Sequence, residues 1–305
     1  MSNLKFQIMK REKLLKSLAL GMFILSSIAI VSCKDDDNGG GNGGKIDPST
    51  IATSNLIAYF PFDNNGNDAV GTLTPTSNPG VTYVAGVRNN AYQGADGAYF
   101  LYDLPTGSKL KTLKTFTISM WFYGTPAIDG VAPVPGILQI NGTSDATWGN
   151  MCLTQDRMPA AADSLNIKMV FHKDGADWAN QFVGFSNSAF TENYWMHIVF
   201  TYDNATSKYM VYVNGTALEL NSGITDRWAE DDTHTPRTAL GDLAFVDATK
   251  MSIGGWMQRV IGASTDEWMG YFTGKMDELR IYDRSLTSTE VQNLFVAEVS
   301  QMTAE

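Results

Sequence analysis

The acidic side chains of this sequence are candidates for catalysis, because a pair of carboxylates can hydrolyse a glycosidic bond. A retaining glycosidase holds them about 5–5.5 Å apart, which on one strand requires both side chains to point to the same face. No Glu-x-Asp-x-Glu or Glu-x-Asp-x-x-Glu run occurs here. Acids stand side by side instead, as in Asp277-Glu278, and neighbours on a strand point to opposite faces. Glu278 shares a face with Arg280, which predicts a structural ion pair.

The histidines and cysteines give no second catalytic pattern. His172, His197 and His234 lie far apart with no Ser or Cys motif beside them, so a catalytic triad is not indicated. No His and Cys pair has the spacing of zinc ligands. His197 shares a predicted strand face with apolar neighbours, which favours a packed structural imidazole.

Oxygen-bearing side chains surround a glycine in residues 63–68, a run that Asp63 opens. Calcium takes six to eight oxygen ligands, and the run resembles half of a calcium loop. It lacks the distant bidentate Glu of an EF-hand. An Asn- and Gly-rich turn without a metal explains the same residues, so both interpretations stay open.

Several tryptophans lie in or beside predicted loops with polar residues around them. Sugars stack on aromatic faces while polar groups bind their hydroxyls, and an exposed aromatic patch usually marks a binding site. The sequence therefore predicts a ligand site formed by Trp178, Trp228, Trp256 and Arg259. The alternative is that these rings only close the ends of the fold.

The N-terminus has the layout of an export signal. A basic segment at residues 5–16 precedes an uncharged run at residues 17–32, which is short for a membrane-spanning helix. Ile30-Val31-Ser32-Cys33 resembles a bacterial lipobox, so residues 1–32 are predicted to be a lipoprotein signal peptide and Cys33 the lipidated residue. Residues 33–50 form an acidic, Gly/Asn-rich tether.

The Lys and Asp residues at positions 34–37 resemble an export tag for the outer face of the outer membrane; a plain acidic linker is the alternative. We therefore expect a lipid-anchored outer-membrane protein facing the cell exterior. The formal net charge of −10 argues against nucleic acid as a partner. Cys152, the second of two cysteines, has no disulfide partner. The oligomeric state is not indicated.

Alternating apolar residues bounded by turn signals predict strands through most of the remaining chain. Residues 195–202, 208–214 and 217–220 read as a meander, with Asn214-Gly215 as a tight turn. The other strands are predicted at residues 56–62, 98–101, 115–123, 136–140, 165–172, 182–186, 251–254 and 271–282. Thr287 and Glu290 form a capping box that predicts a short C-terminal helix. The fold class is all-β, a two-sheet antiparallel β-sandwich.

Six stretches carry a family resemblance in their order along the chain: residues 56–63, 116–121, 195–199, 212–215, 253–255 and 274–286. They resemble the laminin G-like, concanavalin A-like jelly rolls of secreted bacterial proteins. The resemblance implies a jelly-roll domain over residues 51–298 and a tail at 299–305. Residues 143–162 and 221–250 match no family segment and are expected to be loops or insertions.

The resemblance implies an architecture that serves lectins, adhesion modules and, in related folds, glycosidases. In related jelly rolls an Asp at the start of the last long strand meets the end of the first strand at a calcium ion. Asp277 occupies that place, which implies a structural Ca²⁺ held with Asp63.

Together these features predict a non-enzymatic, cell-surface module that binds a glycan. An adhesion module for a surface protein is the alternative. A glycoside hydrolase is less favoured.

Overall fold

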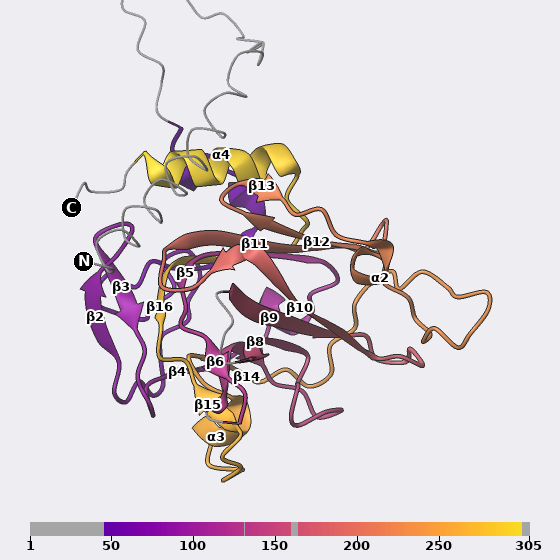
Figure 1. Cartoon of the computed structure of the whole chain (residues 1–305), viewed down its shortest axis with the longest axis horizontal. Coiled ribbons are helices and arrows are strands. Elements are labelled where there is room, and N and C mark those ends of the chain that lie inside the picture. Colours follow the sequence, from indigo (N-terminus) through magenta and orange to yellow (C-terminus); the bar gives the residue numbers. More distant parts are fainter. Residues whose placement is uncertain (1–45, 131, 160–163, 301–305) are drawn as a thin grey trace, which may run out of the picture. The chain divides into compact units, whose positions relative to one another are not determined.

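The computed structural model describes residues 46–130, 132–159 and 164–300 and shows two largely antiparallel sheets packed face to face (Figure 1). The predicted all-β sandwich, with its short C-terminal helix, is thus confirmed. Sheet A runs in the order β13 (Thr216–Ala217), β12 (Lys208–Val213), β11 (Met196–Asp203), β5 (Phe116–Tyr123), β16 (Lys275–Tyr282), β3 (Asn90–Gln93) and β2 (Thr82–Ala85), and β1 (Leu56–Phe60) also pairs with β16.

Sheet B runs in the order β10 (Asn180–Thr191), β9 (Ser164–His172), β8 (Met151–Met158), β7 (Val134–Ile140), β14 (Lys250–Ile253) and β4 (Phe100–Asp103). Two short strands join it in parallel, β15 (Met269–Tyr271) beside β7 and β6 (Ala127–Ile128) beside β8. The remaining elements are η1 (Pro48–Thr50), η2 (Thr53–Asn55), η3 (Lys109–Lys111), α2 (Ser222–Thr225), α3 (Met257–Val260) and α4 (Ser288–Val299).

The core lies between the sheets and follows from the alternation of apolar residues. The apolar face predicted for β5 is buried there, and the ring of Phe116 meets that of Phe171 from β9 at 5.4 Å between centroids. Alternate residues of β8 and β9, such as Leu153 and Met169, are fully buried in the same cluster. One face of each central strand therefore supplies the core, and the other face is left for other contacts.

Helix α4 covers the outer face of sheet A (Figure 1). The predicted capping box is present, with the Thr287 side chain accepting from the Glu290 backbone and the Glu290 side chain accepting from the Thr287 backbone. Val291 of the helix and Leu286 before it pack on Val199, Tyr212 and Tyr282 of the sheet.

The prediction that residues 143–162 form a loop or insertion was wrong. They contain β8, a central strand of sheet B whose inward residues Met151 and Leu153 are fully buried. Three of the four residues in its second half, from Gln155 to Met158, are polar. The alternation of apolar and polar residues that marks a strand is therefore absent there. Residues 221–250 are mainly irregular, as expected, with α2 and the start of β14 as their regular elements.

Candidate functional site

The residues that the structure describes cover the outer face of sheet B only in part. The strand register places Phe182, Val170, Cys152, Gln139 and Ser252 in one row across β10, β9, β8, β7 and β14. The start of α3 packs over one end of this row, where Gln139 Oε1 accepts from the Met257 backbone at 2.7 Å. At the other end Phe182 is 40% exposed. The β10 side of this face is thus open to a ligand.

Four aromatic rings lie along this face in edge-to-face contact, and we call them the aromatic cluster: Trp148, Phe182, Trp256 and Trp268. Ring centroids are 5.2 Å apart between Phe182 and Trp148, 5.3 Å between Trp148 and Trp256, and 5.0 Å between Trp256 and Trp268. Trp148 and Trp268 are half-buried. The cluster packs on Val134, Cys152, Val170 and Met269, so the sheet fixes the rings in place.

The structure corrects the role expected for Trp256. This side chain is 1% exposed, and its indole N–H donates to the Val134 carbonyl at 2.7 Å. A ring between two other tryptophans, with its only donor satisfied by the backbone, offers no free face for a sugar. Trp256 therefore supports Trp148 and Trp268 and does not itself form the predicted stacking surface. Sequence reasoning missed these two rings and Phe182 as site residues, since only strand register reveals the face they share.

Arg259 lies half-buried in α3, three residues beyond Trp256. Its guanidinium carbon is 6.0 Å from the centroid of Tyr271, a ring that in turn stacks on Tyr99 at 6.1 Å. The predicted arginine thus lies beside aromatic rings of β15 and of the segment before β4.

Trp178 and Trp228, the other two predicted ligand residues, come together at a different place. The buried Gln181 amide donates to both of their carbonyl oxygens, at 2.7 and 2.9 Å. The guanidinium carbon of Arg237 lies 4.9 Å from the Trp228 centroid and covers one face of the ring. Both rings are half-buried. The two residues are therefore joined through their backbones, and the Trp228 ring is partly screened by Arg237.

Polar side chains stand beside the aromatic cluster on β8 and β9. Lys168 Nζ lies 5.6 Å from the Trp148 centroid and pairs with Asp156. Thr154 lies opposite Lys168, and Asn166 lies opposite Asp156. Within the described residues neither Thr154 Oγ1 nor Asn166 Oδ1 has a hydrogen-bond partner, although both atoms are buried. Atoms buried in this way cost free energy unless something pairs with them.

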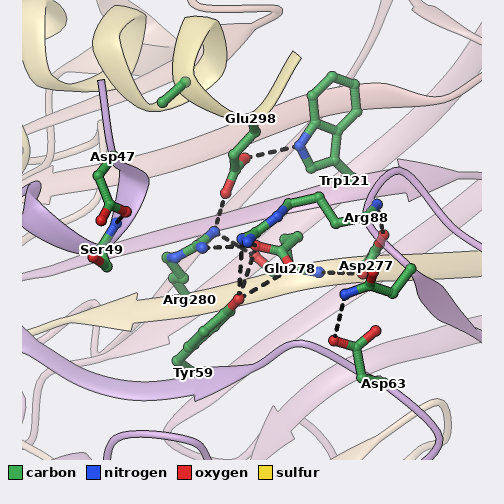
Figure 2. A network of polar contacts seen from close by, with 12 residues as sticks. Asp47, Ser49, Tyr59, Asp63, Arg88, Trp121, Asp277, Glu278, Arg280 and Glu298 are labelled. Carbon is green, nitrogen blue, oxygen red and sulfur yellow. Dashed lines mark hydrogen bonds and ion pairs between the residues drawn. The ribbon is translucent and has the colours of Figure 1, made fainter. Parts of the chain in front are cut away.

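A buried polar network lies on the opposite side of the sandwich, between sheet A and α4 (Figure 2). The predicted Glu278–Arg280 ion pair is present at 2.7 Å, and Arg280 also pairs with Glu298 of α4. Glu298 accepts from the indole N–H of Trp121 at 2.8 Å. Arg88 pairs with Glu278 at 2.8 Å. These contacts tie the helix to the sheet, so the network is structural.

Burial shifts the pKa values of three groups near this network. It raises the pKa of Glu298 to about 7 and that of Asp277 to about 8, since burial disfavours a charged carboxylate. It lowers the pKa of His197 to about 3. His197 is fully buried between the rings of Trp121 and Phe295, as expected for a packed imidazole.

Asp63 and Asp277, the two residues expected to hold a calcium ion, both contact the turn before β3. Asp63 accepts from the Asn90 backbone and the Asn89 amide, both at 3.0 Å. Asp277 accepts from the backbone of Arg88 at 3.0 Å and of Glu278 at 2.9 Å. Each of the four carboxylate oxygens thus accepts one N–H group (Figure 2). Calcium stays a prediction.

The described ranges contain no group of three or more His, Cys, Asp and Glu residues placed to hold a metal ion. Nor does any helix of residues 46–130, 132–159 or 164–300 have the length and apolar character to cross a membrane. Shallow cavities of about 690 and 400 Å³ lie over β11 and β12 and beside η3. Cys33, the signal peptide and nearly all of the tether lie outside the described residues.

Comparison with known proteins agrees with the sandwich. The family model Laminin_G_3, described as the concanavalin A-like lectin/glucanases superfamily, matches residues 94–247, about half of the chain. No curated protein matches the sequence.

Solved structures with the same fold include two botulinum neurotoxin binding domains. The one of type DC, in complex with rat synaptotagmin II, is 12% identical over 82% of this chain and 52% of its own, with a TM-score of 0.54. The one of serotype D, in complex with N-acetylneuraminic acid, is 11% identical over 81% and 52%, with a TM-score of 0.53. This chain spans about half the length of these structures, and the likeness shows the fold alone.

A third structure is domain 4 of an extracellular arabinanase from Geobacillus stearothermophilus, in complex with arabinotriose. It is 20% identical over 79% of this chain and 98% of its own, with a TM-score of 0.47.

Proposed function

The chain belongs to the concanavalin A-like lectin/glucanase superfamily, and we propose that it is a non-catalytic glycan-binding module held at the cell surface by lipid on Cys33. The observation that carries the proposal is the aromatic cluster on the open face of sheet B. Phe182 is exposed there and the rings of Trp148 and Trp268 are half-buried, so each can offer apolar surface to a sugar ring.

The polar surroundings suit sugar hydroxyls. Lys168 supplies N–H donors beside Trp148, and the Asp156 carboxylate that pairs with it supplies acceptors on the same face. Binding sites for small ligands combine apolar rings with a few such polar groups. The acids of this face do not include a pair on alternate residues of one strand, which favours binding over glycoside hydrolysis.

The position of the first described residues supports display on a tether. Asp47 caps η1, and η1 packs against α4 on the sheet A side of the sandwich. The described domain therefore begins on the side of the sandwich opposite to the aromatic cluster, so residues 46–50 do not cover the open face of sheet B.

The experiment is a binding screen of the purified mature chain against linear oligosaccharides of arabinose, xylose, glucose and mannose. We expect at least one series to bind, and Phe182→Ala and Trp268→Ala to weaken that binding by about 2- to 10-fold each, because a stacked aromatic pair contributes about 0.5–1.5 kcal/mol beyond area burial. Val70→Ala is the matched control, since Val70 is 48% exposed in the loop after β1.

Equal affinities of Phe182→Ala, Trp268→Ala and the wild type would contradict this placement of the site. If none of the oligosaccharides binds, a surface protein becomes the better candidate ligand, since the same exposed rings can bury an apolar protein patch.

A further inference from the structure

A chain of hydrogen bonds on the open face of sheet B ends at an exposed serine. Ser144 Oγ lies 3.2 Å from His172 Nε2, and His172 Nδ1 lies 2.7 Å from Asn180 Oδ1. Asn180 Nδ2 donates to Asp145 Oδ2 at 2.8 Å. His172 is only 3% exposed, whereas Ser144 is exposed. We call these four residues the relay.

The chemistry of the groups fixes the direction of each hydrogen bond. A carboxylate can only accept, so Asn180 turns its NH₂ group toward Asp145 and its carbonyl oxygen toward His172. That oxygen also only accepts, so the imidazole carries a proton on Nδ1. In the neutral imidazole, Nε2 then accepts, and the Ser144 hydroxyl donates its hydrogen to it. Ser144 Oγ consequently presents only lone pairs to the outside.

The relay lies beside the aromatic cluster. Asn180 and His172 form the pair of residues next to Phe182 and Val170 on the same face of β10 and β9, about 7 Å along the strands. The loop that carries Ser144 and Asp145 also carries Trp148, whose backbone N–H donates to Asp145 Oδ1 at 3.0 Å. The ring of Trp148 contacts Phe182. Ser144 is thus joined to the aromatic cluster both through its loop and through the pairing of β9 with β10.

We propose that Ser144 Oγ is a fixed hydrogen-bond acceptor for a hydroxyl group of the sugar residue that stacks on Trp148 or Phe182. The inference rests on the proposed function and identifies a polar contact of that same site. It also defines the ligand class: a sugar residue with a free ring hydroxyl that donates at this position.

The order serine, histidine, amide is also that of a hydrolytic triad, but the surroundings favour binding. Acyl transfer needs backbone or side-chain donors aimed at the developing oxyanion. The N–H groups of Thr147 and Trp148, in the same loop as Ser144, are both donated to Asp145 Oδ1, at 2.9 and 3.0 Å. These two N–H groups hold Asp145 in place and are not available to an oxyanion.

The test uses the mature chain, the oligosaccharide of the arabinose, xylose, glucose and mannose series that binds it best, and calorimetric titration. Ser144→Ala should weaken binding by about 2- to 10-fold, the effect of one net hydrogen bond. Ser222→Ala, which alters an exposed serine at the start of α2, should bind like the wild type.

In a deoxyfluoro version of the ligand, fluorine replaces the hydroxyl group and cannot donate a hydrogen bond. The wild type should bind this version about 2- to 10-fold more weakly than the unmodified ligand. Ser144→Ala should bind both ligands with equal affinity. Equal affinities of Ser144→Ala and the wild type would overturn the inference and leave the proposed function standing. Absence of any binding by the wild type would instead overturn the proposed function and this inference with it. Covalent labelling of Ser144 by phenylmethylsulfonyl fluoride would identify it as a nucleophile and overturn the acceptor role.

Discussion

Glu298 holds α4 on sheet A, and its replacement by Ala should destabilise the fold strongly. The side chain is fully buried and joins Arg280 of β16 to Trp121 of β5 (Figure 2). Its removal leaves part of the Arg280 guanidinium and the Trp121 N–H without a partner under the helix. Breaking a buried ion pair by deleting one partner costs about 3–5 kcal/mol. Since Arg280 keeps its pair with Glu278, we expect about 3 kcal/mol.

Urea unfolding followed by tryptophan fluorescence measures this cost. Glu298→Gln keeps the shape and one of the two acceptor oxygens but turns its NH₂ group toward either Arg280 or Trp121, so it should cost less than Glu298→Ala but more than nothing. Glu290→Ala is a second comparison, because that half-buried residue caps the same helix and caps contribute about 1 kcal/mol. The reasoning is refuted if Glu298→Ala costs no more than Glu290→Ala.

Three further predictions concern pH, calcium and the anchor. Burial raises the pKa of Glu298 to about 7 and that of Asp277 to about 8, so near neutral pH the folded state binds protons that the unfolded chain has released. The free energy of unfolding therefore falls as the pH rises through these values. The melting temperature should be higher at pH 6.5 than at pH 8.5. A decrease over this interval would contradict these assignments. If calcium joins Asp63 and Asp277, excess EDTA lowers the melting temperature of the purified chain; an unchanged value removes calcium from the account. Cys33→Ser should move the protein from the membrane fraction to the soluble fraction of its cell, whereas continued membrane association would argue against the lipid anchor.

The sequence predicted most of the fold because the sandwich depends on local alternation. Strands with one wholly apolar face, such as β5 and β11, were located to within a residue or two at each end. β8 was missed because its second half is polar on both faces, and β2 and β3 were missed because they are short. The Glu278–Arg280 pair was predicted correctly, but strict alternation was not: a β-bulge between Asp277 and Arg280, with Glu278 at φ 52°, breaks the expected placing of Asp277 and Glu278 on opposite faces.

The candidate site was harder to predict because it depends on which strands become neighbours. Nothing local distinguishes Trp256, buried between two rings, from Trp148 and Trp268, which keep part of their surface. The relay joins Ser144 to His172 and Asn180, and only the pairing of β9 with β10 and the path of the loop before β8 bring them together. These three residues are distant along the chain, so no short sequence motif marks them.

The most direct measurement of the central claim is a crystal structure of the mature chain with the best-binding oligosaccharide. We predict a sugar ring against Phe182, Trp148 or Trp268 on the open face of sheet B, with one hydroxyl donating to Ser144. A sugar bound instead between Trp178 and Trp228, or in the cavity over β11 and β12, would contradict the account.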